Sequence, residues 1–280
     1  MVKIRICAAQ FGVEQEFSAN IRKSGHLMKK AQKNDCNIIC FPEIFLTGPL
    51  SKKGYDSSIP KKAKKAFSDY CRNYSIFCVM GSIIEKIGGD YYNISYIFDN
   101  KGDIIGSCKK SHLVLKSEGK YLKSGNEPPV FKTKIGKIGI QVCRDLLYPE
   151  MTRKLMLNGA EIVFCPSFWA EKSASYDNIY NNKYFKDISP REVDFLVSAR
   201  AIESEVIFVY ANAAGEYING NSRSLLLGRT QIALPFYGTT DRLSHNKEGL
   251  LVKEVNLDAV KDARKVYKIK EDIKDYYNKA

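Results

Sequence analysis

The sequence predicts a mixed α/β fold in which β-sheets are covered by helices. Apolar stretches of strand length alternate with segments of helical periodicity along most of the chain. Several neighbouring strands are separated only by short turns, which indicates antiparallel hairpins beside parallel pairing. No repeat, Gly/Ser-rich linker or shift in composition divides the chain, so we expect a single domain spanning residues 1–280.

Strands and helices alternate in the first half of the sequence. Lys3–Gln10 alternates and is rich in Ile and Ala, which predicts a strand, and Ser18–Lys33 carries apolar residues at helical spacing. The short apolar run Asn37–Phe41 predicts a buried strand. The next expected elements are a helix at Pro60–Tyr74, strands at Ile76–Glu85 and Tyr92–Asp99, and a turn at Asn100–Asp103.

The second half continues the alternation. Gly136 lies in the turn of a predicted hairpin formed by Val130–Lys134 and Lys137–Val142, and Gly159 closes a helix at Glu150–Asn158. The remaining expected elements are strands at Glu161–Cys165, Val206–Asn212, Ser224–Leu227, Gln231–Leu234 and Leu250–Val255, a helix at Pro190–Glu203, and a basic helical tail. The irregular stretch 171–189 is interpreted either as a lid over a site or as a surface or oligomer segment.

Composition excludes several classes of protein. Of the 280 residues 44% are hydrophobic, enough for a sizeable core, and no apolar run has the length of a membrane span. The net charge of +13 comes from basic residues spread along the chain and interleaved with acids, without a nucleic-acid recognition motif. The chain begins directly with a strand rather than a signal peptide. We therefore expect a cytoplasmic protein with neither a nucleic-acid nor a membrane partner.

Eight cysteines are present, and most lie in apolar, strand-like runs where a free thiol packs as a small hydrophobic group. Cys36 and Cys40 lack the second ligand pair that a zinc site needs, and nothing predicts disulfides. Nucleotide-binding glycine motifs and a Gly-x-Ser-x-Gly elbow are also absent from the sequence.

Three positions suggest chemistry. Cys143 follows a predicted strand and precedes a helix, a position that can expose a thiol beside backbone N–H groups. Glu43 lies in an apolar segment after Pro42, where a desolvated carboxylate becomes basic enough to accept a thiol proton. Lys110 can supply a cation. Taken singly, each also fits a structural interpretation as a buried thiol, a surface carboxylate or a solvated lysine.

Together and in this order, the three segments resemble those of the nitrilase superfamily of carbon–nitrogen hydrolases. Glu43 matches the family's glutamate after proline, Lys110 its lysine before x-His-Leu, and Cys143 its nucleophile before x-Asp. Glu118 falls where relatives carry an accessory glutamate that orients the lysine, although this stretch departs most from the family pattern. The resemblance extends over nearly the whole chain.

The resemblance implies a four-layer α-β-β-α sandwich of two mixed sheets covered by helices. It also implies a homodimer or higher homo-oligomer, for which the tail at about 259–280 is the expected contact. No metal and no organic cofactor is expected. Cysteine-dependent cleavage of a small amide through a thioester, which releases ammonia or an amine and a carboxylate, is the implied reaction.

Substrate choice is less sharply defined. Phe168 and Trp169 resemble the family position beside the scissile group, and Arg144 follows the nucleophile. We therefore assign these three residues to substrate binding. The alternative is that Phe168 and Trp169 pack in the core and that Arg144 faces solvent. A small aliphatic or aromatic amide is the first expectation and a nitrile the second. An N-carbamoyl hydrolase, a catalytically silent member with a binding role, and a glutaminase module feeding a separate synthetase subunit remain further alternatives.

Overall fold

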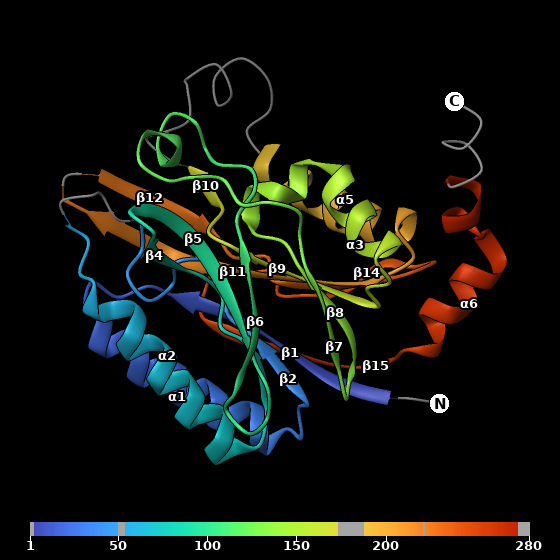
Figure 1. The fold of residues 1–280 in the computed structure, drawn as a ribbon, viewed down its shortest axis with the longest axis horizontal. Coiled ribbons are helices and arrows are strands. Elements are labelled where there is room, and N and C mark those ends of the chain that lie inside the picture. The colour runs from blue at the N-terminus through green and yellow to red at the C-terminus, as the bar shows by residue number, and fades with distance from the viewer. Residues whose placement is uncertain (1–2, 50–53, 173–187, 221, 274–280) are drawn as a thin grey trace.

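A computed structural model describes residues 3–49, 54–172, 188–220 and 222–273 of the chain. Two sheets, joined to each other at one point, form its centre (Figure 1). Most of the stretch 171–189, interpreted above as a lid or an interface segment, lies outside the described residues.

The first sheet carries the N-terminal strand in its interior. Strand β1 pairs in parallel with β2 and antiparallel with β15, and β2 continues in parallel to β3. Its strands are β1 (Lys3–Gly12), β2 (Ile38–Cys40), β3 (Phe77–Val79), β4 (Ile83–Ile87), β5 (Asp90–Phe98), β6 (Ile104–Lys109) and β15 (Gly249–Asn256).

The second sheet is built around the parallel strands β8, β9 and β11. It joins the first sheet where the end of β1 pairs with the middle of β11, Phe11 opposite Ala213. Its strands are β7 (Val130–Thr133), β8 (Gly136–Ile140), β9 (Ile162–Ser167), β10 (Ala170–Lys172), β11 (Ile207–Asn219), β12 (Ser222–Leu227), β13 (Gln231–Leu234) and β14 (Gly238–Arg242).

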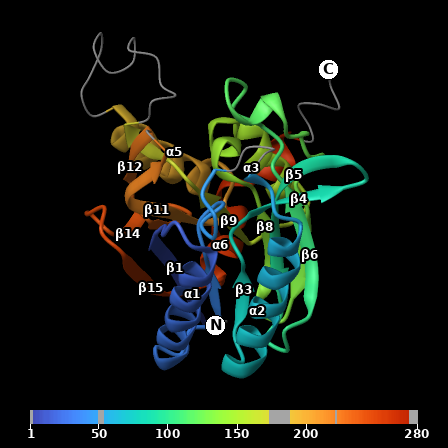
Figure 2. The ribbon, with the colours of Figure 1, turned by 90° about the vertical axis from the view of Figure 1, so that its left-hand side faces the viewer.

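Three apolar clusters separate four layers. Alternate residues of β1 point to opposite faces, as a strand requires: Cys7 and Phe11 pack under helices, whereas Ile6 packs between the two sheets. Helices α1 (Phe17–Lys33) and α2 (Ser58–Tyr74) cover the first sheet. Helices α3 (Pro149–Leu157) and α5 (Ile188–Glu203) cover the second (Figures 1 and 2). The predicted α-β-β-α sandwich is confirmed.

One predicted strand is wrong in extent. The segment Ile76–Glu85 forms two short strands, β3 and β4, rather than one. Gly81 interrupts it with a φ of +73°, and a Cβ built at Gly81 would lie 2.0 Å from the carbonyl oxygen of Pro42. Only glycine fits this close approach, and the Ser82 N–H donates to the same Pro42 carbonyl at 3.3 Å. The break therefore brings the chain against the segment that carries Glu43.

The strands β6, β10 and β14 were not predicted, and β11 runs seven residues beyond the predicted end at Asn212. Exposed or polar side chains interrupt the apolar alternation in these segments, so their strand character comes from tertiary pairing. Strand β6, for example, exposes Ile104 and Ile105 and is held by its antiparallel partner β5.

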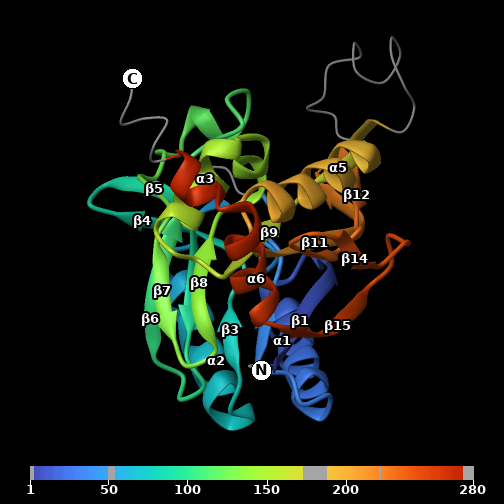
Figure 3. The same ribbon diagram turned by 90° about the vertical axis from the view of Figure 1, so that its right-hand side faces the viewer.

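The C-terminal tail forms helix α6 (Asp258–Tyr267), which crosses one end of both sheets (Figure 3). Beyond it, Ile269 and Ile273 pack against the cluster beneath α3 and α5. The described part of the tail is therefore anchored on its own chain. None of the helices in the described ranges is both long and apolar enough to cross a membrane.

Candidate active site

Cys143 is placed by a sharp turn after β8. The chain continues from β8 through Gln141 and Val142, and a short 3-10 helix, η3 (Cys143–Leu147), begins at the cysteine. Cys143 adopts a φ of +49°, a conformation that costs a non-glycine residue about 1–2 kcal/mol and is concentrated at functional sites. The Asp145 N–H donates the first hydrogen bond within this helix, to the Val142 carbonyl at 3.0 Å. The Arg144 N–H lies one residue earlier, at the start of the helix, where backbone N–H groups have no partner within the helix.

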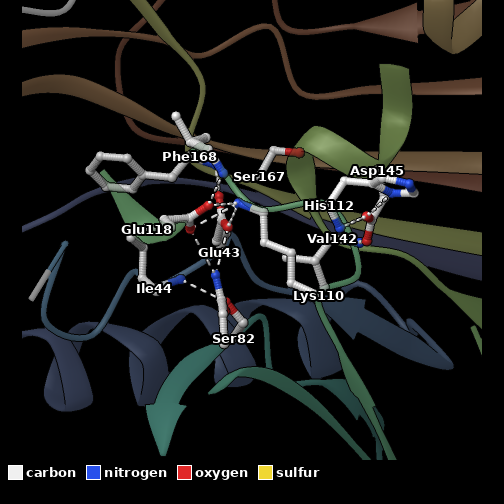
Figure 4. A network of polar contacts seen from close by, with 12 residues as sticks. Glu43, Ile44, Ser82, Lys110, His112, Glu118, Val142, Asp145, Ser167 and Phe168 are labelled. Atoms are coloured by element: carbon white, nitrogen blue, oxygen red, sulfur yellow. Dashed lines mark hydrogen bonds and ion pairs between the residues drawn. The ribbon is translucent and has the colours of Figure 1, made fainter. Parts of the chain in front are cut away.

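Glu43 lies in the loop after β2 and is held from two sides. Its N–H donates to the Ser167 carbonyl at 3.2 Å, and its carboxylate accepts the Phe168 N–H at 3.0 Å. The next residue, Ile44, also has a positive φ, +39°, and its N–H donates to the Ser82 hydroxyl at 3.1 Å. These bonds tie the Glu43 loop to the end of β9 and to the break between β3 and β4 (Figure 4).

Lys110 follows β6 and is 1% exposed. Its ammonium group lies between two carboxylates, 2.7 Å from Glu43 Oε1 and 2.8 Å from Glu118 Oε2. Its own backbone is fixed by the N–H bond to the Asn93 carbonyl at 2.8 Å. Three of the four positions predicted from the sequence, Glu43, Lys110 and Glu118, therefore lie in one polar cluster (Figure 4). The fourth, Cys143, lies close enough to Glu43 and Lys110 for their charges to shift its pKa.

Two further donors complete the cluster. The Asn93 amide donates to Glu43 Oε1 at 2.8 Å and lies 3.4 Å from Glu118 Oε1. The Val114 N–H donates to Glu118 Oε2 at 2.9 Å. Because one buried lysine does not neutralise two carboxylates, these neutral donors supply the remaining stabilisation that buried charges require.

Burial and charge shift the pKa values in a consistent way. Burial raises the pKa of Glu43, and the Glu118 charge raises it further, while Lys110 acts in the opposite direction. Burial alone would lower the pKa of Lys110, but the charges of Glu43, Cys143 and Glu118 outweigh it and hold that pKa well above its ordinary value. The cluster therefore keeps a protonated lysine beside a carboxylate that is more basic than an ordinary glutamate.

The Cys143 thiol is a neighbour of this carboxylate. Burial raises the pKa of the thiol well above its usual value, and the neighbouring Glu43 carboxylate raises it further. Lys110 and the Phe168 N–H act in the opposite direction. At rest the sulfur is thus protonated, with a proton acceptor and a fixed cation nearby.

Asp145, which the sequence reasoning did not select, joins the cysteine turn to the lysine segment. Its Oδ2 accepts the Val142 N–H at 3.0 Å, and its Oδ1 accepts both the His112 N–H and His112 Nδ1 at 2.8 Å (Figure 4). Asp145 is fully buried. The sequence feature that could have pointed to Asp145 is its position two residues after Cys143, in Cys-Arg-Asp. The feature that could have pointed to Asn93 is a polar residue within an apolar strand.

We expect Asp145→Asn to lower both stability and turnover. One of its oxygens becomes an NH₂ group that faces backbone donors, and each buried donor left unsatisfied costs about 1–3 kcal/mol. Urea unfolding and kcat measure the two effects. Asp99→Asn is the matched control, since Asp99 also accepts two backbone N–H groups, but in an exposed turn. Equal losses of kcat in both variants would contradict a positioning role for Asp145.

The three residues assigned to substrate binding have different surroundings. The Phe168 ring packs edge-on against Tyr217 at 5.5 Å, beside the Glu43 loop. The Trp169 side chain is buried in the cluster that also contains Cys143, and its indole N–H has no hydrogen-bond partner among the described residues. Arg144 instead lines a pocket of about 640 Å³ with residues of the Ser111–Ser124 segment.

The arrangement fits one kind of chemistry well. A thiol, a basic carboxylate beside it, a buried cation and an open helix end are the components needed for nucleophilic attack on a carbonyl carbon with stabilisation of the resulting oxyanion.

Comparison with known proteins points to the same chemistry. The family model described as carbon-nitrogen hydrolase matches residues 3–265. The 2-oxoglutaramate amidase of Bacillus subtilis is 26% identical over 99% of this chain and 100% of its own length. The deaminated glutathione amidase of Dictyostelium discoideum is 26% identical over 88% of this chain and 85% of its own length.

A solved structure has the same fold. The carbon-nitrogen hydrolase from Helicobacter pylori G27 superimposes with a TM-score of 0.88 at 21% identity, over 99% of this chain and 98% of that protein.

Proposed function

Because the chain belongs to the carbon-nitrogen hydrolase family, we propose that it hydrolyses a small amide at the Glu43–Lys110–Cys143 cluster, with Glu118 as the accessory carboxylate. Cysteine-dependent cleavage of a non-peptide carbon–nitrogen bond is the activity class of the chain. The observation that carries the residue assignment is the position of the Cys143 thiol beside a buried carboxylate that is itself held by Lys110 at 2.7 Å.

The chain's own groups account for each step. Glu43 takes the thiol proton as the sulfur attacks the amide carbon, and Lys110 with the Arg144 N–H holds the oxyanion. The C–N bond breaks as Glu43 returns the proton to the leaving nitrogen, which departs as ammonia or an amine. Glu43 then activates a water molecule that hydrolyses the thioester and restores the thiol, with a carboxylate as product.

Glu118 acts through Lys110. Its carboxylate lies 2.8 Å from the ammonium group, opposite Glu43, and is anchored by the Val114 N–H. We assign it the role of fixing the direction of the lysine N–H bonds toward the oxyanion.

An amide is favoured over a nitrile as substrate. Two relatives that match over most of this chain are named amidases, of 2-oxoglutaramate and of deaminated glutathione. Buried Trp169 offers an indole N–H without a partner among described residues, and we propose that this donor and the Phe168 ring contact the acyl part of the substrate. An ammonia-release assay over amides, nitriles and N-carbamoyl compounds tests the choice; release from nitriles alone would contradict it.

The acid limb of kcat/KM is expected at a pH above 4.5, the ordinary glutamate value, because the pKa of Glu43 is raised. Only ionised Glu43 accepts the thiol proton, so activity is lost as the pH falls through this raised pKa. The Glu118 charge contributes to the shift, and Glu118→Gln should move the acid limb to lower pH. A limb at the ordinary value, unmoved in Glu118→Gln, would contradict the assignment of Glu43 as base.

We also propose that the protein pairs with a second copy through the face formed by α5, the turn before β14 and α6. Phe195 and Tyr237 are 72% and 75% exposed, and the Phe236 and Tyr267 rings lie 5.3 Å apart across this face. Such exposed aromatic groups are typical of interfaces. Light scattering should give a dimer or larger assembly that Phe195→Glu weakens; a monomeric wild-type protein would reject the proposal.

A further inference from the structure

A polar pocket lies beside the proposed reacting centre. It is the pocket of about 640 Å³ lined by Arg144, and we call it the Arg144 pocket. Three lining residues, Ser111, Gly119 and Arg144, directly follow Lys110, Glu118 and Cys143 in the sequence. Neither Cys143 nor Glu43 lines it, and Figure 4 shows His112, another lining residue, across the Lys110 side chain from Glu118.

The lining is cationic. Arg144 and Lys123 supply the charge, and the lining contains no aspartate or glutamate. Arg144 Nε is buried without a hydrogen-bond partner in the described part of the chain. Within those residues, no ion pair joins Arg144 or Lys123 to an acidic side chain. Glu192 is near Arg144 only as a charge. Asp145 is already bound to His112 and to backbone N–H groups. A buried guanidinium donor without a partner is costly unless a ligand satisfies it.

The remaining walls define what kind of anion fits. Leu113 and Leu122 are buried apolar side chains of the lining, and Tyr148 adds an aromatic face that stacks on His112 at 3.5 Å. A planar carboxylate matches the fork of a guanidinium, and the apolar walls suit a hydrocarbon body better than a free phosphate. We propose that the Arg144 pocket binds a small organic carboxylate at a site separate from the reacting sulfur.

Such a ligand would contact the residues that follow the three proposed catalytic positions. Binding would therefore couple the Lys110 and Glu118 segment to the cysteine turn, which Asp145 already links. The carboxylate can belong to the amide substrate itself or to a separate molecule, and the two sources share the same recognition chemistry.

Calorimetric titration with butyrate tests the pocket without relying on turnover. The protein is first alkylated at Cys143 so that the reacting centre is blocked. We expect saturable binding that is weakened about tenfold by Arg144→Gln and by Lys123→Gln. Lys120→Gln is the matched control, because Lys120 is exposed on the same segment but does not line the pocket. Equal affinities in all four proteins, or no binding of butyrate, would overturn the proposal.

Kinetics then separate the two sources. If the carboxylate is part of the substrate, Lys123→Gln raises KM for succinamate and leaves KM for butyramide unchanged. If it is a separate molecule, added butyrate changes the rate of butyramide hydrolysis in the wild type and not in Lys123→Gln. Failure of the proposed hydrolysis would leave the titration result intact, so the two proposals fail separately.

Discussion

Replacing Cys143 with alanine is expected to abolish turnover, by a factor on the order of 10⁴ or more, while the protein stays folded. Among the described residues, no other thiol lies beside both a buried carboxylate and a buried lysine. Loss of one small buried group costs about 1–2 kcal/mol of unfolding free energy. Ammonia release and thermal unfolding, measured on the same preparation, separate lost chemistry from lost folding.

Cys36 supplies the control for this experiment. It is 7% exposed, close to the 8% of Cys143, and its hydrogen bond with Cys7 and nearby Arg5 lower its pKa. It is therefore the thiol that competes for alkylating reagents. Cys36→Ala should retain full activity, and substrate should protect Cys143, but not Cys36, from iodoacetamide. Full activity in Cys143→Ala would reject the proposed reaction centre.

Glu43→Gln is expected to lower kcat/KM by about 10²–10⁴-fold, the range typical of a lost general base. The amide cannot take the thiol proton, and it cannot activate water for hydrolysis of the thioester. The introduced glutamine side chain also has only one acceptor oxygen, so its NH₂ group must face either the Phe168 N–H or the Lys110 ammonium group, both of which donate to Glu43. The slow residual reaction should therefore lose the acid limb of its pH profile.

Glu85→Gln is the matched control for the loss of a paired carboxylate. Glu85, in β4, accepts from Lys64 of α2 at 2.7 Å and from the Tyr96 hydroxyl at 2.6 Å. We expect it to keep its activity. If Glu43→Gln retained both its rate and its acid limb, another group would have to be the base.

The secondary structure could be predicted where apolar periodicity is strong. The prediction failed where tertiary contacts determine the backbone conformation. The β7–β8 hairpin around Gly136 forms as predicted, since its turn and alternation are local. The break at Gly81 could not be predicted, because its cause is the Pro42 carbonyl, 39 residues away in sequence. Strand β6 likewise depends on pairing with β5.

The candidate site divides in the same way. Glu43, Lys110 and Cys143 could be selected because each lies in a distinctive segment. The roles of Asn93 and Asp145 arise only in the folded chain, because each bridges segments that are distant in sequence. Phe168 was selected for its ring, yet its backbone N–H is the group that contacts Glu43.

Mass spectrometry of the enzyme quenched during turnover tests the central claim most directly. With a slow amide substrate, and most clearly in Glu43→Gln, we expect the acyl group on the peptide that contains Cys143, released over time with the carboxylate product. Hydrolysis that proceeds with no acyl group on Cys143, or with the acyl group on another residue, would contradict the account.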